Sequence, residues 1–287
     1  MRPEDQAFIA EAATFFETPS TFTRALNGMG TYVEGGLSKL PVKVRDAGLK
    51  ASRRAIEGCL TAAVKTLDPR TALNEKEFFD LFEVSTKSKQ NRTAHTVAAG
   101  ATGAVGGFFG PLALAVELPI STALIMRSIA STARDFGFDP RDPETLTESL
   151  FVFAIGGPSN KDDGMDSIYL TSRLALSSVM RQAATSMAGL PAKELIRALE
   201  RETAPALVRL VTAVSESFGV RVSQKLMAQM APVLGAAGGA AINIAFADFF
   251  GKAAHYHFGM KRLEKIYGTE NVQAAYKTSS LGLEARK

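Results

Sequence analysis

Hydrophobic positions recur at helical spacing along most of the chain. The first apolar stripe lies in residues 3–17 and predicts an amphipathic helix that docks on the rest of the protein. Residues 18–36 are rich in turn-forming side chains and predict a linker. Residues 37–67 return to the helical pattern, and residues 71–91 predict a mostly polar helix. Asp166 or Ser167 is expected to cap a helix that runs through Tyr169 and Met180, and two further amphipathic helices are predicted around Pro191 and Pro205. Because no segment of useful length alternates as a strand would, the pattern predicts an all-α protein.

Two long apolar runs, within residues 96–131 and 226–251, set the centre of the predicted fold. Both carry small residues four positions apart, such as Gly103 and Gly107 in the first run, and this spacing lets two helix backbones approach closely. Each run is uncharged for about twenty residues, the length that crosses a bilayer. Insertion is marginal, because the first run contains five glycines and ends at Glu117, and the second contains Gln229 and Asn243 and ends at Asp248. A buried pair of helices and a hairpin that enters lipid therefore both remain open. The predicted fold is an all-α helical bundle with two central Gly/Ala-rich apolar helices.

The same pattern divides the chain into three parts. Residues 1–36 form an N-terminal helix and linker, residues 37–270 a helical domain, and residues 271–287 a polar C-terminal tail. The composition agrees with closely packed helices, since 46% of the residues are hydrophobic, with a large share of Ala, and there is no Trp.

Charge and cysteine content narrow the function classes. The net charge of +4 is too small to indicate nucleic-acid binding, and aromatic and basic residues do not interleave as on a strand-binding surface. The single cysteine, Cys59, excludes an intramolecular disulfide and fits a reducing compartment. The first residues contain acids where a secretory leader would be basic, so we expect a cytoplasmic protein.

The basic face of residues 37–67 is one candidate functional surface. Its cations outnumber its acids and would attract anionic lipid headgroups by about 1 kcal/mol each. A solvated helix face is the alternative interpretation. The candidates for contact with a membrane surface are Lys39, Lys43, Arg45, Lys50, Arg53 and Arg54.

Polar side chains near the ends of the apolar runs form the second candidate group. Pro119 is expected in the first turn of a helix, which would place Glu117 beside the free N–H groups at that helix end. Arg127 follows on the same helix and, if buried, needs Glu117 or Asp248 as a partner, so Arg127→Ala is expected to destabilise the protein by several kcal/mol. The complete group is Glu117, Arg127, Asn243, Asp248 and His257, with His255 on the same helix face as Asp248.

Three interpretations of this group remain. It is an ion-pair network that fixes helix register, a pocket for a polar ligand or lipid headgroup, or a metal or acid–base site made by two carboxylates and a histidine. The sequence has no HExxH, no DxD and no nucleophile elbow. We therefore predict no catalytic residue, no metal and no cofactor.

Three stretches of the chain together resemble the EcsC protein family. They are FFGPLALAVELPISTALIMRSIASTARDFGFDP, FAIGGPSNKDDGMDSIYLTSRLAL and APVLGAAGGAAINIAFADFFGKAAHYHFGMKRLEKIYG. The likeness covers roughly residues 50–268 and leaves the first 49 residues outside it. The positions that match the family pattern are Glu117, Pro119, Ser121, Thr122, Arg127, Gly156, Gly157, Asp166, Tyr169, Arg173, Asn243, Asp248, His257, Phe258, Arg262, Leu263, Glu264, Tyr267 and Gly268. His255 does not belong to this pattern, which weakens a metal site that uses it.

The resemblance implies an α-helical bacterial protein whose founding family member is encoded beside an ABC transporter and has no agreed biochemical activity. We therefore expect a non-enzymatic accessory protein, cytoplasmic and peripherally associated with the inner membrane or an ABC-type transporter. The alternative is a metal-dependent hydrolase with Glu117, Asp248 and His257 around a pocket, and a soluble ligand-binding protein is a third hypothesis. Neither the ligand nor the oligomeric state follows from the sequence.

Overall fold

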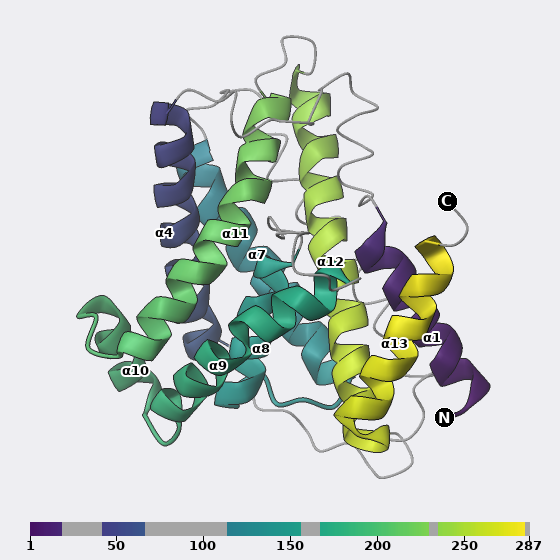
Figure 1. The fold of residues 1–287 in the computed structure, drawn as a ribbon. Coiled ribbons are helices and arrows are strands. Elements are labelled where there is room, and N and C mark those ends of the chain that lie inside the picture. The colour runs from purple at the N-terminus through teal and green to yellow at the C-terminus, as the bar shows by residue number, and fades with distance from the viewer. Residues whose placement is uncertain (19–41, 67–113, 156–166, 230–234, 285–287) are drawn as a thin grey trace.

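The computed structural model of the protein describes residues 1–18, 42–66, 114–155, 167–229 and 235–284, and every regular element in these ranges is an α-helix (Figure 1). The helices are α1 (Pro3–Glu17), α4 (Val42–Thr66), α7 (Leu114–Asp135), α8 (Pro143–Ala154), α9 (Ile168–Met187), α10 (Ala192–Glu200), α11 (Pro205–Gln229), α12 (Gly235–Tyr267) and α13 (Thr269–Glu284). The predicted all-α class is confirmed. The predicted helix at residues 71–91 and the glycines Gly103 and Gly107 lie outside the described residues.

Helix α8 lies at the centre of the bundle. All of residues 145–154 are buried, and α4, α7, α9, α11 and α12 contact this helix. Its start is well specified, because Asp142 caps it by accepting the N–H of Thr145 at 3.1 Å and Pro143 occupies the first turn. A helix that is buried on all sides must satisfy its polar side chains internally, which makes Glu148 in its middle the feature that needs an explanation.

Helices α4, α7 and α11 pack together beside α8, and α12 packs against α7. The buried face of α4 carries Ala55, Ile56, Cys59 and Leu60. Helix α7 begins at Leu114 rather than at Pro119, so Pro119 lies inside the helix. The helix tolerates this proline because the ring removes only one backbone hydrogen bond, to the carbonyl of Ala115, close to the helix start. Among the described helices, none has the length and hydropathy needed to cross a membrane.

Helix α12 joins the second apolar run and the following basic segment into one element of 33 residues, about 50 Å long. It ends at Gly268, whose φ of 84° is the left-handed conformation that closes many helices and favours glycine. The chain continues directly into α13, which packs on α1 and α12 with Val272 and Tyr276 buried. The residues expected to form a polar tail are therefore largely part of the bundle, because an apolar pair four residues apart gives α13 a buried face.

The predicted helix at residues 3–17 is confirmed as α1, and it docks on α12 and α13 as expected (Figure 1). The buried apolar residues of α1 are Phe8, Ile9, Ala12, Ala13 and Phe16. Gly259 on α12 permits this close approach, since a Cβ atom there would overlap the Phe8 ring. The hydroxyl of Tyr267, the last residue of α12, donates to Asp5 Oδ2 at 2.7 Å and ties the start of α1 to the body.

Candidate functional site

The structure separates most members of the predicted polar group. Arg127 is exposed, because Ile120, Arg127 and Arg134 recur every seven residues along the outer side of α7. Asp248 pairs with Lys252 instead, with 2.7 Å between Oδ2 and Nζ, at the partly exposed side of α12. Arg127 therefore does not hold the core, contrary to the prediction.

The remaining members of the group are Glu117, Asn243, His255 and His257. Glu117 lies in α7, but its side chain is outside the described part of the structure; ten helical residues, about 15 Å, separate it from Arg127. Asn243 is buried on α12. His255 is buried as well, against the rings of Phe8 and Phe136, whose centroids are 5.6 Å and 5.3 Å from its own. His257 enters a buried polar site.

His257 connects three helices through both of its ring nitrogens. Its Nδ1 lies 2.9 Å from the hydroxyl oxygen of Tyr169 on α9, and its Nε2 lies 3.0 Å from Glu148 Oε2 on α8. All three side chains are buried. The carboxylate of the central helix is thus satisfied by a histidine from α12, which explains how α8 accommodates Glu148.

The protonation states follow from the surroundings. Burial would raise the pKa of Glu148, but the hydrogen bond from His257 and the charges of Lys261 and Arg173 hold it well below its usual range. Burial lowers the pKa of His257 and outweighs the opposite effect of Glu148, so the ring is neutral. An ionised carboxylate only accepts, which assigns the proton to Nε2 and leaves Nδ1 to accept from Tyr169. Burial in turn raises the pKa of Tyr169, which keeps its hydroxyl protonated.

Two cations and two carboxylates alternate around this chain of hydrogen bonds. Lys261 Nζ lies 2.7 Å from Glu148 Oε1 and 4.0 Å from Glu264 Oε2. Arg173 binds Glu264 through two parallel hydrogen bonds, with 3.0 Å between Nη2 and Oε2, and its guanidinium lies 5.8 Å from the centre of the Tyr169 ring. With His257 neutral the charges balance, which is what buried ions require. The His257 network comprises Glu148, Tyr169, Arg173, His257, Lys261 and Glu264.

Helix α1 covers the tyrosine of this network. Phe16 stacks on Tyr169 with the ring centroids 4.2 Å apart and the planes 6° from parallel. Glu17 accepts hydrogen bonds from the Ser167 hydroxyl at 2.7 Å, the Ile168 N–H at 2.9 Å and the Tyr276 hydroxyl at 2.7 Å. Ser167 is the N-cap of α9 and accepts from the Leu170 N–H, as the capping signal before Tyr169 predicts. The end of α1 thus supplements the cap of α9 with a carboxylate.

The order hydroxyl, imidazole and carboxylate is the order that activates a nucleophile in hydrolases. Here, however, Tyr169 is enclosed by Phe16, Phe151 and Tyr276, and its hydroxyl is committed to His257. The arrangement fixes the register of α8, α9 and α12 and supports the ion-pair interpretation made from the sequence, with other partners. Glu148 and Lys261 were not among the predicted site residues, although Glu148 is a lone carboxylate inside the otherwise uncharged residues 145–154.

The geometry does not favour the metal site expected under the hydrolase hypothesis. Asp248 and His257 are nine residues apart on α12, half a turn round the helix and about 13.5 Å along its axis. Within the described part of the chain, no group of three or more histidine, cysteine or acidic side chains is placed to hold a metal ion.

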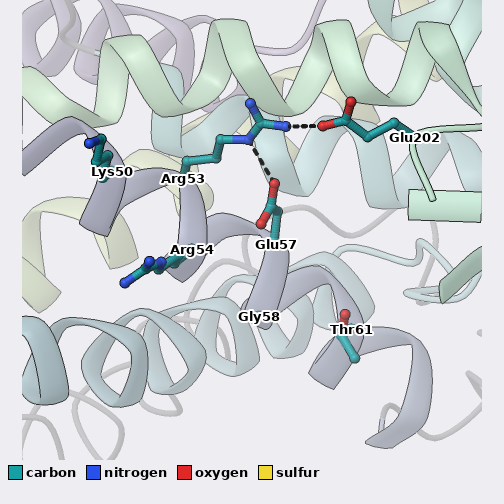
Figure 2. Close-up of a pocket in the computed structure, with 7 residues that line it drawn as sticks. All are labelled: Lys50, Arg53, Arg54, Glu57, Gly58, Thr61 and Glu202. Atoms are coloured by element: carbon teal, nitrogen blue, oxygen red, sulfur yellow. Dashed lines mark hydrogen bonds and ion pairs between the residues drawn. The ribbon is translucent and has the colours of Figure 1, made fainter. Parts of the chain in front are cut away.

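The basic face of α4 forms the second candidate site. Six residues on one side of α4 and Glu202, which follows α10, line a pocket of about 530 Å³ (Figure 2). The lining residues are Lys50, Arg53, Arg54, Glu57, Gly58, Thr61 and Glu202. Three of the six predicted membrane-surface candidates are thus neighbours on one surface. Of the other three, Lys39 lies outside the described residues, and Lys43 and Arg45 lie in α4 with undescribed side chains.

Fold and sites together define an all-α bundle locked by a buried carboxylate–histidine–tyrosine network, with a basic pocket on its surface. The sequence model of the EcsC protein family matches residues 14–263, and the chain belongs to this family. The match begins within α1, so it includes much of the N-terminal segment that the resemblance left out. Four positions of the His257 network, namely Tyr169, Arg173, His257 and Glu264, are among those that the resemblance singled out. No curated protein and no solved structure matches the chain.

Proposed function

We propose that the protein is a non-enzymatic accessory protein that binds peripherally to an anionic membrane surface through the outer face of α4. The observation that carries this proposal is that the side chains of Lys50 and Arg54 are exposed and have no acidic partner among the described residues. The two residues lie one helical turn apart on α4. Cations left unpaired in this way are available to lipid phosphates.

Helix α10 extends this basic surface. Lys193 and Arg197 on α10 and Arg201, directly after its end, are all exposed, and α10 contacts α4 at the left of Figure 1. Each cation near an anionic leaflet contributes about 1 kcal/mol, and acids on the same helices offset part of this. We therefore expect weak, reversible binding that salt weakens, because exposed charges are screened over about 10 Å at 0.1 M salt.

Vesicle flotation tests the proposal. At low salt the protein should float with vesicles of phosphatidylglycerol and phosphatidylcholine but not with phosphatidylcholine alone, and salt should release it. The double variant Lys50→Ala/Arg54→Ala should lose the binding. A matched control, Arg181→Ala/Lys277→Ala, removes two exposed cations from α9 and α13 and should float like the wild type.

Two results would overturn the proposal. Equal loss in both double variants would mean that only total charge matters, and binding to neutral vesicles would mean that α4 is not the contact. Binding to native membranes without binding to anionic vesicles would instead identify a membrane protein, such as a transporter, as the partner.

A further inference from the structure

Arg53 lies at the centre of the pocket on α4, and its guanidinium donates hydrogen bonds in two directions (Figure 2). Its Nε donates to Glu57 Oε1 at 2.8 Å, and its Nη2 donates to Glu202 Oε1 at 2.8 Å. One carboxylate comes from α4 itself and the other from the segment between α10 and α11. Two N–H groups of this planar guanidinium thus donate to anionic oxygens, as arginine N–H groups do when they bind a phosphate.

The contact with Glu202 is easily exchanged. The side chain of Glu202 is 63% exposed and that of Arg53 is 42% exposed, so water screens the pair and little free energy holds it. Glu202 therefore occupies one edge of the arginine without closing the pocket to another anion. Lys50 and Arg54 lie to one side of Arg53 in Figure 2 and would add their charge to any anion that enters.

Glu202 also adopts an unfavourable backbone conformation. Its φ of 53° is the only positive φ among the described non-glycine residues. The Thr203 N–H bonds to the Ala198 carbonyl at 2.9 Å, which closes α10 in the motif where the left-handed position is usually glycine. Glycine would suit the backbone better, so the presence of glutamate indicates that the side chain itself has a use.

A second residue of the same pocket is also unfavourable for local structure. Gly58 lies in the middle of α4, where alanine would stabilise the helix, and a Cβ atom there would meet nothing within 4 Å. Among the described residues, neither packing nor a turn requires this glycine, and it lines the pocket without adding a side chain to it. Two independent departures from local stability thus meet at one pocket, which is typical of a ligand site.

We infer that this pocket binds a phosphate group, with Arg53 as the residue that holds the phosphate oxygens and Glu202 as the carboxylate that the phosphate displaces. The inference rests on the proposed function in naming the source, which is the phosphate of an anionic lipid headgroup. Glu202 then competes with the phosphate for Arg53, so removing its charge should strengthen phosphate binding. If Glu202 only stabilised the pocket, removing its charge should weaken phosphate binding.

Calorimetric titration of the full-length protein with glycerol 3-phosphate tests the site, with vesicles containing phosphatidic acid as the membrane-bound form. Glu202→Gln should lower the Kd about threefold or more. Arg53→Lys keeps the charge but loses the planar fork, and should raise the Kd about tenfold. The matched control is Glu194→Gln, which removes the same charge from an exposed position of α10 outside the pocket. Melting temperatures of the variants report whether they fold.

Equal changes in Kd for Glu202→Gln and Glu194→Gln would overturn the inference, because they would show that only the total charge of the protein affects binding. An unchanged Kd in Arg53→Lys would overturn it as well. If vesicles bind through Lys50 and Arg54 while both pocket variants behave as the wild type, the site fails and the proposed membrane function stands. If glycerol 3-phosphate binds with the expected pattern but vesicles do not, the phosphate site stands with a soluble ligand and the membrane function fails.

Discussion

Gly259→Ala separates helix propensity from packing at the point where α1 lies closest to α12. In a helix interior alanine is favoured over glycine by about 1 kcal/mol. Here the new Cβ would overlap Cζ and Cε1 of Phe8 and lie 3.2 Å from Cε2. The ring cannot simply turn aside, because Phe136 and His255 pack on it with centroids 6.4 Å and 5.6 Å away.

The expected loss follows from what Phe8 must give up. The residue is 7% exposed, and driving its ring out of the core forfeits about 1.5–3 kcal/mol of burial. Keeping the ring in place instead strains the core by about 1–3 kcal/mol. After subtraction of the propensity gain of about 1 kcal/mol, expulsion of the ring lowers the free energy of unfolding by about 0.5–2 kcal/mol and strain lowers it by up to about 2 kcal/mol. For a chain of this length the corresponding fall in Tm is up to about 4 °C.

Thermal and urea unfolding followed by circular dichroism would measure this loss. The control is Gly282→Ala on α13, where a Cβ meets nothing within 4 Å, so only the propensity gain is expected. In the Phe8→Ala background, Gly259→Ala should stop being destabilising, because the overlapping ring is gone. If Gly259→Ala raises the Tm as much as Gly282→Ala does, α1 does not pack on α12 in the way described.

Three further predictions use the same unfolding assays. Stability should fall as the pH drops below about 6.5, because burial lowers the pKa of His257 and the unfolded chain therefore binds the proton first. The lowered pKa of Glu148 should add a further loss of stability below about pH 4.3. Urea titrations across pH 4–8 would show both losses. Arg173→Ala should destabilise the protein by about 3 kcal/mol, because Glu264 is left buried without its bidentate partner, and a loss under 1 kcal/mol would contradict this. Arg127→Ala should change stability by less than about 0.5 kcal/mol, and a larger loss would show a role in the core.

Local signals predicted the helices well. The helix at residues 3–17 and the cap at Asp166 or Ser167 depend on spacing and capping chemistry within a few residues; the helix is confirmed, and Ser167 is the residue that caps α9. The predicted start of α7 was wrong, because Pro119 lies one turn inside the helix and not in its first turn. Residues 271–287 were predicted to be a polar tail, but residues 271–284 belong to α13, since Val272 and Tyr276 suffice for a buried face once α1 supplies the facing surface.

The partners of polar side chains were much harder to predict. His257 was a correct candidate for a buried polar site, but Glu148 is 109 positions away, and no local pattern connects them. Arg127 and Asp248 looked complementary by charge, yet their orientation depends on how α7 and α12 rotate in the bundle. The pocket depends on Glu202, whose position follows from the turn after α10 and not from the basic pattern of α4.

The contacts of α1 also set an order of events during synthesis. Asp5 bonds to Tyr267 across 262 positions, and Glu17 bonds to Tyr276 across 259. At about 5–20 residues per second, the ribosome takes about 13–50 s between these partners. During that interval the surface of α12 and α13 on which Phe8 and Phe16 pack has not been completed. Helix α1 is therefore synthesised before the other helices of the bundle but docks among the last.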